Sequence, residues 1–333
     1  MTLESAGHPL LRQEVAKLHL VNPDDVLIIT PQEGIYIAMH CLVDYFSRTY
    51  GDDRSHVITT YPAYQSLYEN LHTLRCQVDY WMVKESGDGW YFDMADLRQL
   101  IRDDTRLLVV NFPHNPTGYL LPEDQWREII EICERRNIFL FSDEMYRLSN
   151  NDQSAPLVSA CTAMTNSVTL FGVSKTLALP GLRIGWLCTK HSTLMTSMKS
   201  FRDYITICCS APAEILALIA LRNKNEILKR TLAIIEKNLH LLADFFREYE
   251  DVFEWRAPRA CTTGLVKLKG WLLRLGNGGA KGFCERLQEE AGVLMLPSAV
   301  YEFDDNCVRL GFGRTDLKYA LIALREFLRR NKP

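Results

Sequence analysis

Short apolar runs that alternate with helical segments constrain the fold of this chain more than any other feature. Each run is as long as a typical strand, and polar turn residues separate it from the next helical pattern. The predicted strands lie near residues 26–30, 56–60, 77–83, 106–111, 138–142, 168–172 and 183–188. Strands that alternate with helices form mainly parallel sheets covered on both faces. We therefore expect an α/β domain with such a sheet.

A long helical pattern begins near residue 210 and separates this sheet from a second unit. It runs through EILALIALRNKNEILKRTLAIIEKNLHLLADFFREYE and leads to a smaller α+β region that ends in the helix LKYALIALREFLRR. With 333 residues, 47% of them hydrophobic, the chain is long enough for two domains. We expect a large domain over 21–209, and a linking helix with a small domain over 210–333. Residues 1–20 are expected to form a helix that packs with the small domain.

Three chemically useful side chains stand where predicted strands end. Asn115 lies in the turn NPTG after the run 106–111, Asp143 ends the run IFLFSD, and Lys175 closely follows the run SVTLFG. Taken singly, each has an ordinary explanation as a turn residue, a helix N-cap or a solvated loop lysine. Ligands of open α/β sheets bind outside the carboxyl ends of the strands. The three side chains together therefore indicate one site.

Lys175 and Arg183 lie eight residues apart in SVTLFGVSKTLALPGLRIGWL. A partly desolvated lysine has a lowered pKa and can attack an aldehyde to form a Schiff base. An arginine binds a phosphate dianion through its planar fork. Pyridoxal phosphate carries both an aldehyde and a phosphate, so this segment predicts a site for pyridoxal phosphate.

The order NPTG, then D-x-x-Y, then SK with an arginine eight residues later resembles the class I/II, fold-type I pyridoxal-phosphate aminotransferases over nearly the whole chain. The resemblance implies that Lys175 forms the Schiff base and that Arg183 binds the phosphate. It also implies that Asp143 pairs with the ring nitrogen of the cofactor, while Asn115 and Tyr146 bond its phenolic oxygen. A protonated ring is an electron sink, and a released Lys175 can move a proton between the substrate Cα and the cofactor.

The strand and helix in VLIITPQEGIYIAMHCLVDYF (26–46) predict a phosphate cup at the helix N-terminus. Free N–H groups and the positive end of a helix bind phosphate, which assigns Gln32, Glu33 and Gly34 to this cup. The turn PQEG is similar to that of a subgroup containing capreomycidine synthase and arginine-modifying enzymes. Tyr64 matches the family position whose aromatic ring stacks on the pyridine, and we count it with the catalytic residues.

A segment near the C-terminus supplies the predicted substrate arginine. GVLMLPSAVYEFDDNCVRLGFGR (292–314) resembles the family hairpin in which an arginine binds the substrate α-carboxylate. This assigns Arg309, with Asn115 as a second substrate contact, whereas Arg314 is expected in a surface or supporting position. Many relatives have a Ser or Thr at the position of Gly172 that contacts the phosphate. One phosphate hydrogen bond is therefore either missing or supplied by Ser174.

The first residues, MTLESAGHPLLR, depart from the family pattern Tyr-Thr-x-x-x-Gly-x-Pro-x-Leu-Arg. Met1 stands where that pattern has a tyrosine that reaches the phosphate of the neighbouring subunit, and the flexible arm before it is missing. The resemblance implies a homodimer with its sites at the interface. We expect either that a longer form of the protein exists or that this chain has a weakened, open site.

Composition argues against several classes of function. A net charge of −3 and a pI near 6.3 give no electrostatic reason to expect nucleic acid or an anionic membrane as a partner. No secretory signal is visible, and Pro212 and Glu214 interrupt the most apolar stretch (205–221), so we expect a cytoplasmic protein. The 10 cysteines include no C-x-x-C pair, so no metal site is predicted. His114 is the one histidine near the predicted site and a candidate contact.

Motifs for the cofactor do not specify the reaction, because the orientation of a bond to the ring decides whether it breaks. Transamination between an L-amino acid and a 2-oxo acid is the first expectation, since it is the commonest outcome among the relatives. An arginine-type oxidase or cyclase is the alternative suggested by PQEG and Gly172. A weakly catalytic homologue with a binding role is a third hypothesis, suggested by the missing arm. The intact Lys175, Asp143 and Arg309 favour an enzyme of amino acid metabolism or biosynthesis.

Overall fold

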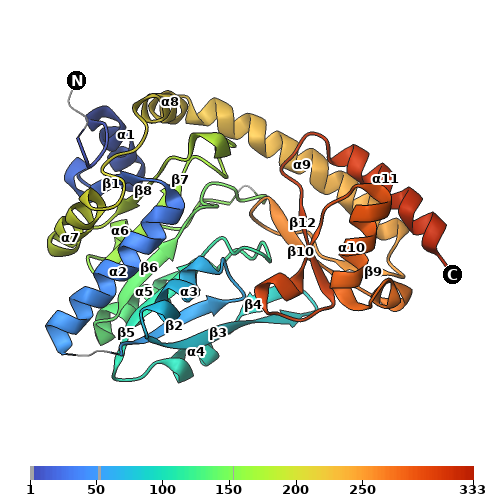
Figure 1. Ribbon diagram of the computed structural model, residues 1–333, viewed down its shortest axis with the longest axis horizontal. Helices are drawn as coiled ribbons and strands as arrows, with labels where there is room; N and C mark the ends of the chain where they lie inside the picture. The colour runs from blue at the N-terminus through green and yellow to red at the C-terminus, as the bar shows by residue number, and fades with distance from the viewer. Residues whose placement is uncertain (1–3, 52–53, 153) are drawn as a thin grey trace.

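The computed structural model describes residues 4–51, 54–152 and 154–333, and its larger part is built on an eight-stranded sheet (Figure 1). The strands are β1 (Val26–Ile29), β2 (His56–Tyr61), β3 (Gln77–Ser86), β4 (Gly89–Phe92), β5 (Thr105–Asn111), β6 (Phe139–Asp143), β7 (Ser167–Gly172) and β8 (Gly185–Cys188). Their order is β1-β8-β7-β6-β5-β2-β3-β4. The pairings from β7 to β3 are parallel, and those at both edges are antiparallel. The expected mainly parallel sheet is confirmed. Met1 lies outside the described residues.

Strand β4 forms a hairpin with β3 and was not predicted from the sequence. Ser86 lies opposite Gly89 in this pairing, so β3 continues beyond its predicted end at residue 83. Gly89 has φ 114°, a conformation that glycine adopts readily. The hairpin forms one edge of the sheet, separated from β6 and β7 in the sheet order by β5 and β2.

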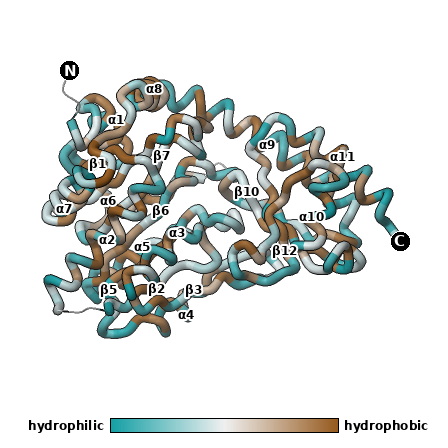
Figure 2. The backbone as a smooth tube through the Cα atoms, in the orientation of Figure 1, coloured by the Kyte–Doolittle hydropathy of each residue, from teal (hydrophilic) through white to brown (hydrophobic). Residues whose placement is uncertain are grey.

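Both faces of the parallel strands β2, β5, β6 and β7 are buried, as their mainly apolar runs require. Figure 2 shows the hydrophobic colouring concentrated along the central strands. Helices α2 (Pro31–Tyr50), α3 (Ser66–Thr73) and α7 (Ser192–Asp203) cover one face, and α4 (Met94–Leu100), α5 (Glu123–Arg136) and α6 (Ala160–Ala163) lie on the other. The polar loops at the strand ends are thereby fixed to a rigid support.

Helix α1 (Pro9–His19) packs on the large domain, which corrects the expectation that residues 1–20 pack with the small domain. Leu11 and Val15 lie four residues apart on one face of the helix, and both are fully buried. They pack against β1, β8 and helix α8 (Ala211–Arg222). The apolar face of α1 is therefore used to cover the β1–β8 edge of the large sheet.

The small domain is a four-stranded antiparallel sheet with its own apolar core. Its sheet order is β11-β12-β10-β9, and helix α9 (Lys224–Glu248) leads to it from the large domain (Figure 1). The other elements of the small domain are β9 (Phe253–Trp255), β10 (Thr263–Leu268), α10 (Gly279–Ala291), β11 (Leu296–Pro297), β12 (Cys307–Gly311), α11 (Leu317–Asn331) and the short 3₁₀ helices Gly270–Arg274 and Ser298–Tyr301. Two further 3₁₀ helices, Pro23–Asp25 and Pro180–Leu182, lie in the large domain. Within the described ranges, no helix is long and apolar enough to span a membrane.

Residues 258–261 lead into β10 and are hydrogen-bonded to loops of the large domain. The N–H of Asn151 donates to the carbonyl of Arg259 at 2.7 Å, that of Cys261 to Ser149 at 3.1 Å, and that of Ala260 to Gly118 at 3.2 Å. Gly118 has φ 72°, and a Cβ there would lie only 2.2 Å from the Cβ of Pro258. This close approach ties the small domain to the edge of the large sheet at which β5 and β6 end.

Candidate active site

A cavity of about 340 Å³ opens at the carboxyl ends of β5, β6 and β7, within the range of small-molecule sites. Its wall includes side chains from both domains, because Arg309 on β12 contributes to it. Nine of the eleven predicted site residues line this cavity: Gln32, Tyr64, Asn115, Asp143, Tyr146, Ser174, Lys175, Arg183 and Arg309. The structure therefore brings most of the predicted side chains together.

Asp143 is the last residue of β6 and is 4% exposed. Its Oδ1 accepts a hydrogen bond from the N–H of Met145 at 3.0 Å. Burial raises the pKa of Asp143 to about 7, against the opposing effects of this hydrogen bond and of the nearby Lys175 ammonium. A positively charged partner in the cavity would therefore stabilise the ionised carboxylate.

Asn111 also lines the cavity and was missed by the sequence analysis. Its amide nitrogen donates to the carbonyl of Asp143 at 3.0 Å, and its Oδ1 accepts from the N–H of Asn115 at 2.9 Å. One side chain thus fixes the backbone of two predicted site residues. The signal available in the sequence was a polar residue at the end of an otherwise apolar run.

Lys175 lies in the loop after β7 and opens to the cavity. The surrounding protein partly desolvates its ammonium and lowers its pKa, and the positive charge of Arg309 acts in the same direction. Asp143 acts in the opposite direction. The Nζ of Lys175 lies 5.7 Å from the centre of the Tyr146 ring. A lysine in such surroundings loses its proton more readily than one in water and is better prepared for nucleophilic attack.

Arg309 reaches the cavity from the small domain. Its Nη1 donates to Oδ1 of Asn115 at 3.2 Å, and its guanidinium lies 5.8 Å from the centre of the Tyr301 ring. No carboxylate among the described residues forms an ion pair with it. Its planar donors are therefore available to a carboxylate in the cavity.

The lining of the cavity also includes Arg183, Ser174, Tyr64 and Gln32, which combine cationic and neutral hydrogen-bonding groups. Arg183 is exposed and donates to the carbonyl of Pro180 at 3.1 Å. The buried Oγ of Ser174 has no hydrogen-bond partner in the described part of the chain. The Tyr64 hydroxyl donates to Oε1 of Gln32 at 2.7 Å, which orients the Gln32 side chain in the first turn of α2. Arg183 and Ser174 are donors suited to an anion in the cavity.

Glu33 and Gly34 do not line the cavity, which corrects their assignment to the phosphate cup. The N–H of Gly34 already donates to the carbonyl of Thr30 at 2.9 Å. A Cβ on Gly34 would lie 2.7 Å from Cδ1 of Ile29, so this glycine is needed where helix and strand pack closely. Glu33 lies 3.7 Å from the buried guanidinium of Arg202 and acts within the first turn of α2.

Gly172 has a packing explanation as well. A Cβ at this position would lie 2.9 Å from the Cα of Gly185 on β8. A serine or threonine therefore does not fit here without displacing the neighbouring strand. Ser174 remains the nearby hydroxyl that lines the cavity.

His114 lies behind the site and does not line the cavity. It is fully buried and bonds the carbonyl of Pro62 at 2.7 Å and the hydroxyl of Thr117 at 2.7 Å. Burial lowers its pKa to about 3, so the neutral ring is the form present. His114 therefore connects the loop after β2 with the loop that carries Asn115. Arg314 is exposed and paired with Asp316 at 2.9 Å.

The fold and the cavity together define a class of protein, and comparison with known sequences identifies it. The profile described as aminotransferase class I and II matches residues 2–324. The chain belongs to this pyridoxal-phosphate-dependent family, and its fold is the fold-type I arrangement.

Individual relatives within the family differ in their reactions. Capreomycidine synthase of Streptomyces vinaceus is 28% identical over 328 residues, which are 97% of this chain and 80% of that protein. Aspartate aminotransferase of Sulfurisphaera tokodaii is 25% identical over 331 residues, 96% of this chain and 80% of that protein. Among solved structures, a PLP-dependent aminotransferase from Streptococcus suis has a TM-score of 0.88 at 30% identity, covering 100% of this chain and 85% of that one. The PLP-dependent cyclase OrfR has a TM-score of 0.88 at 25% identity, and the match covers 99% of this chain and 85% of OrfR.

The residues in the cavity fit the cofactor of this family. The lining carries the cations of Lys175, Arg183 and Arg309 against the single carboxylate of Asp143. This charge excess suits a phosphate dianion, and the unpartnered hydroxyl of Ser174 gives a further donor. The amine of Lys175 suits an aldehyde in the same cavity.

Replacing Asp143 with asparagine is expected to stabilise the ligand-free protein at high pH. Because burial raises the pKa of Asp143 from 3.8 to about 7, the folded protein keeps a proton that the unfolded chain releases. The stability of the wild type therefore falls as the pH rises between these two values. The free energy of unfolding of Asp143→Asn should exceed that of the wild type by at most about 4 kcal/mol near pH 8, and by little near pH 4. Thermal unfolding of both proteins across this range measures the difference.

Asp316→Asn provides the matched control for this experiment. The ion pair with Arg314 lowers the pKa of this exposed carboxyl, so its removal gives no stabilisation that grows with pH. A pH-independent difference between Asp143→Asn and the wild type would contradict the raised pKa.

Proposed function

We propose that this protein is an aminotransferase that moves the amino group of an L-amino acid to a 2-oxo acid, with Lys175 as its Schiff-base residue. The observation that carries the proposal is the convergence of Lys175, Asp143 and Arg309 on one cavity. These side chains provide a nucleophilic amine, a buried carboxylate and a guanidinium that forms no ion pair within the described residues. Together they match the amino acid and the cofactor that the reaction requires.

The family resemblance suggests a role for each predicted residue that lines the cavity. Pyridoxal phosphate, when bound, supplies an electron sink for the reacting amino acid. Asp143 would hold the ring nitrogen in its protonated state, and Asn115 and Tyr146 would bond the phenolic oxygen. Lys175 would carry the proton to and from the substrate Cα. Arg183, Ser174 and Gln32 would bind the phosphate, and the Tyr64 ring would lie against the pyridine.

Removal of the Lys175 amine should abolish both the covalent link to the cofactor and turnover. Borohydride reduction of the wild type in the presence of pyridoxal phosphate should fix the cofactor covalently as a label on the peptide that contains residue 175. Lys175→Ala should carry no label at this site, as measured by mass spectrometry. A labelled Lys175→Ala protein would show that another amine forms the link.

Arg309→Gln is expected to raise the KM for the amino acid by about 10- to 100-fold, because the α-carboxylate loses a charged hydrogen-bonding partner. Arg314→Gln is the control, since Arg314 is exposed and paired with Asp316. Steady-state kinetics with a saturating 2-oxo acid measures both. Equal effects of the two substitutions would contradict the assignment of Arg309.

Cyclisation or oxidation of an arginine-type substrate is the second candidate, and the similarity to capreomycidine synthase and the cyclase OrfR supports it. Asp143 is the only acidic side chain among the described residues that line the cavity. A guanidinium group on the substrate would therefore find no second carboxylate among the described residues that line the cavity, which favours transamination. Incubation with a panel of L-amino acids distinguishes the reactions. Product that depends on a 2-oxo acid indicates transamination, oxygen uptake indicates oxidation, and a cyclic product without an acceptor indicates cyclisation.

We also propose that the protein acts as a homodimer in the cytoplasm. Apolar side chains are exposed between α7 and α8 and along α8, where Tyr204 is 91%, Ile207 62% and Ile219 53% exposed. A second copy would remove this surface from water. Light scattering should give about twice the 38.3 kDa of one chain. A monomeric mass at micromolar concentration would overturn this part of the proposal.

A further inference from the structure

Glu144 follows Asp143 directly but faces away from the cavity. Successive side chains at the end of a strand point to opposite faces, and only Asp143 lines the cavity. Glu144 is equally buried, at 4% exposure. None of the roles proposed above uses this second buried carboxyl group.

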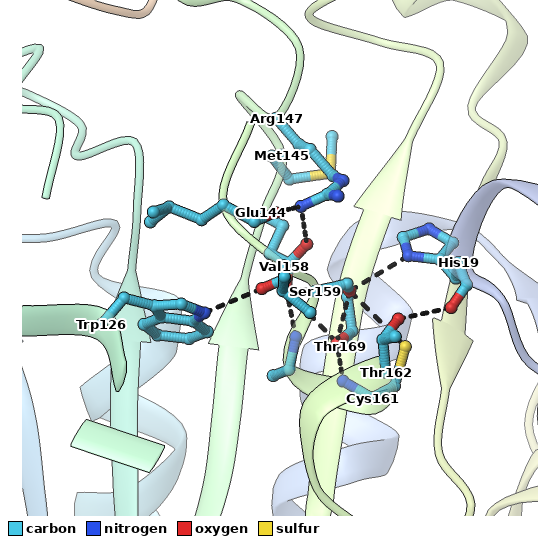
Figure 3. A network of polar contacts seen from close by, with 12 residues as sticks. His19, Trp126, Glu144, Met145, Arg147, Val158, Ser159, Cys161, Thr162 and Thr169 are labelled. Carbon is cyan, nitrogen blue, oxygen red and sulfur yellow. Dashed lines mark hydrogen bonds and ion pairs between the residues drawn. The ribbon is translucent and has the colours of Figure 1, made fainter. Parts of the chain in front are cut away.

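The Glu144 carboxylate is the centre of a polar network that lies behind the cavity (Figure 3). Its Oε1 accepts from the Ser159 hydroxyl at 3.0 Å and from the Ala160 N–H at 2.9 Å, with the Thr169 hydroxyl at 3.4 Å. Its Oε2 accepts from Arg147 at 3.2 Å. Donors from α6, β7 and the turn after β6 thus meet on one side chain. A buried carboxylate that accepts from several donors is held in one orientation, and the loss of its charge weakens each of these hydrogen bonds.

The network extends from Ser159 to helix α1 in a defined direction. The indole of Trp186 donates to Nε2 of His19 at 2.9 Å, and an indole N–H can only donate. The other ring nitrogen of a neutral His19 therefore carries the hydrogen and donates to the Ser159 hydroxyl at 3.1 Å. This leaves the Ser159 hydrogen for Glu144. The chain of donors ends on the carboxylate, and Figure 3 shows the contact between His19 and Ser159.

Glu144 lies in the turn that carries both Asp143 and Tyr146. The N–H of Arg147 donates to the carbonyl of Glu144 at 2.8 Å, which closes the turn. On its other side, the hydroxyl of Thr176 donates to the carbonyl of Arg147 at 2.7 Å. Thr176 is the neighbour of Lys175 in the chain. The turn is therefore held between the Glu144 network and the loop of the proposed Schiff-base lysine.

We propose that Glu144 is a positioning residue, whose contacts with Ser159, Ala160 and Arg147 hold the turn that presents Asp143 and Tyr146 to the cofactor. This inference rests on the proposed function, because Asp143 and Tyr146 act on the cofactor only there. Glu144 touches neither cofactor nor substrate. It acts by restricting the turn relative to the loop of Lys175.

Glu144→Gln tests the proposal, because it keeps the size of the side chain but places a neutral amide against Arg147. We expect the affinity for pyridoxal phosphate to fall about tenfold, as for other supporting groups of a site. The visible absorption band of the bound cofactor should also shift. Hydrogen–deuterium exchange of the amides at 144–149 should become faster in the cofactor-free protein. Titration with the cofactor and exchange with mass spectrometry measure these effects.

Glu214→Gln is the matched control, since Glu214 is a carboxyl of α8 with 1% exposure, close to Arg202 but apart from the turn. It should leave the band, the affinity and the exchange at 144–149 unchanged, even if it lowers the melting temperature. Equal changes in both variants, or none in Glu144→Gln, would overturn the proposal. If Glu144→Gln does not fold, Ser159→Ala should show smaller changes in the same direction. Its control is Ser167→Ala, which removes another buried hydroxyl outside the network.

The two proposals can fail separately. A wild-type protein that gives no visible band with pyridoxal phosphate would contradict the proposed function. The exchange of the amides at 144–149 would still test Glu144 in that case, because it needs no cofactor. A normal band in the wild type together with unchanged exchange in Glu144→Gln would contradict the positioning role alone.

Discussion

The parallel pairing of β5, β6 and β7 is the constraint on which the rest of the site depends. Asn111 lies opposite Asp143 across the β5–β6 pair, and Asp143 lies opposite Leu170 across the β6–β7 pair. Because these strands run in the same direction, the polar segments that follow them emerge at one edge of the sheet. Burial on both faces stabilises this register, since a slip by one residue would exchange the side chains of the two buried faces and disrupt their packing against the covering helices.

The second domain contributes through a different set of contacts. Arg309 lies opposite Leu265 in the β12–β10 pair, so its position follows that of β10. The segment 258–261 before β10 is bonded to the loops after β5 and β6. The guanidinium thus reaches the cavity from a separate sheet while staying in register with the large domain.

Much of the fold and most of the cavity could be predicted from the sequence. Asn115, Asp143 and Lys175 were found because strand ends are visible in the apolar pattern and their order matches a known family. Glu33 and Gly34 were misplaced because the sequence marks a helix N-terminus without showing which of its groups are already used by the helix. The prediction that α1 packs on the small domain was wrong, because an amphipathic pattern shows which face of a helix is buried and not what covers it. Asn111 and the contacts of Glu144 depend on pairing between distant segments, which one sequence does not display.

The division of the cavity between two domains affects which molecules it can select. Lys175 lies in the loop after β7 of the large domain, and Arg309 lies on β12 of the small domain. In the proposed roles, an amino acid contacts both and adds a connection between the domains, whereas a simple amine contacts only the large one. Part of the binding free energy of an amino acid then reflects how the two domains sit against each other. Selectivity for substrates that carry both an amino group and a carboxylate would therefore depend on inter-domain geometry as well as on local contacts.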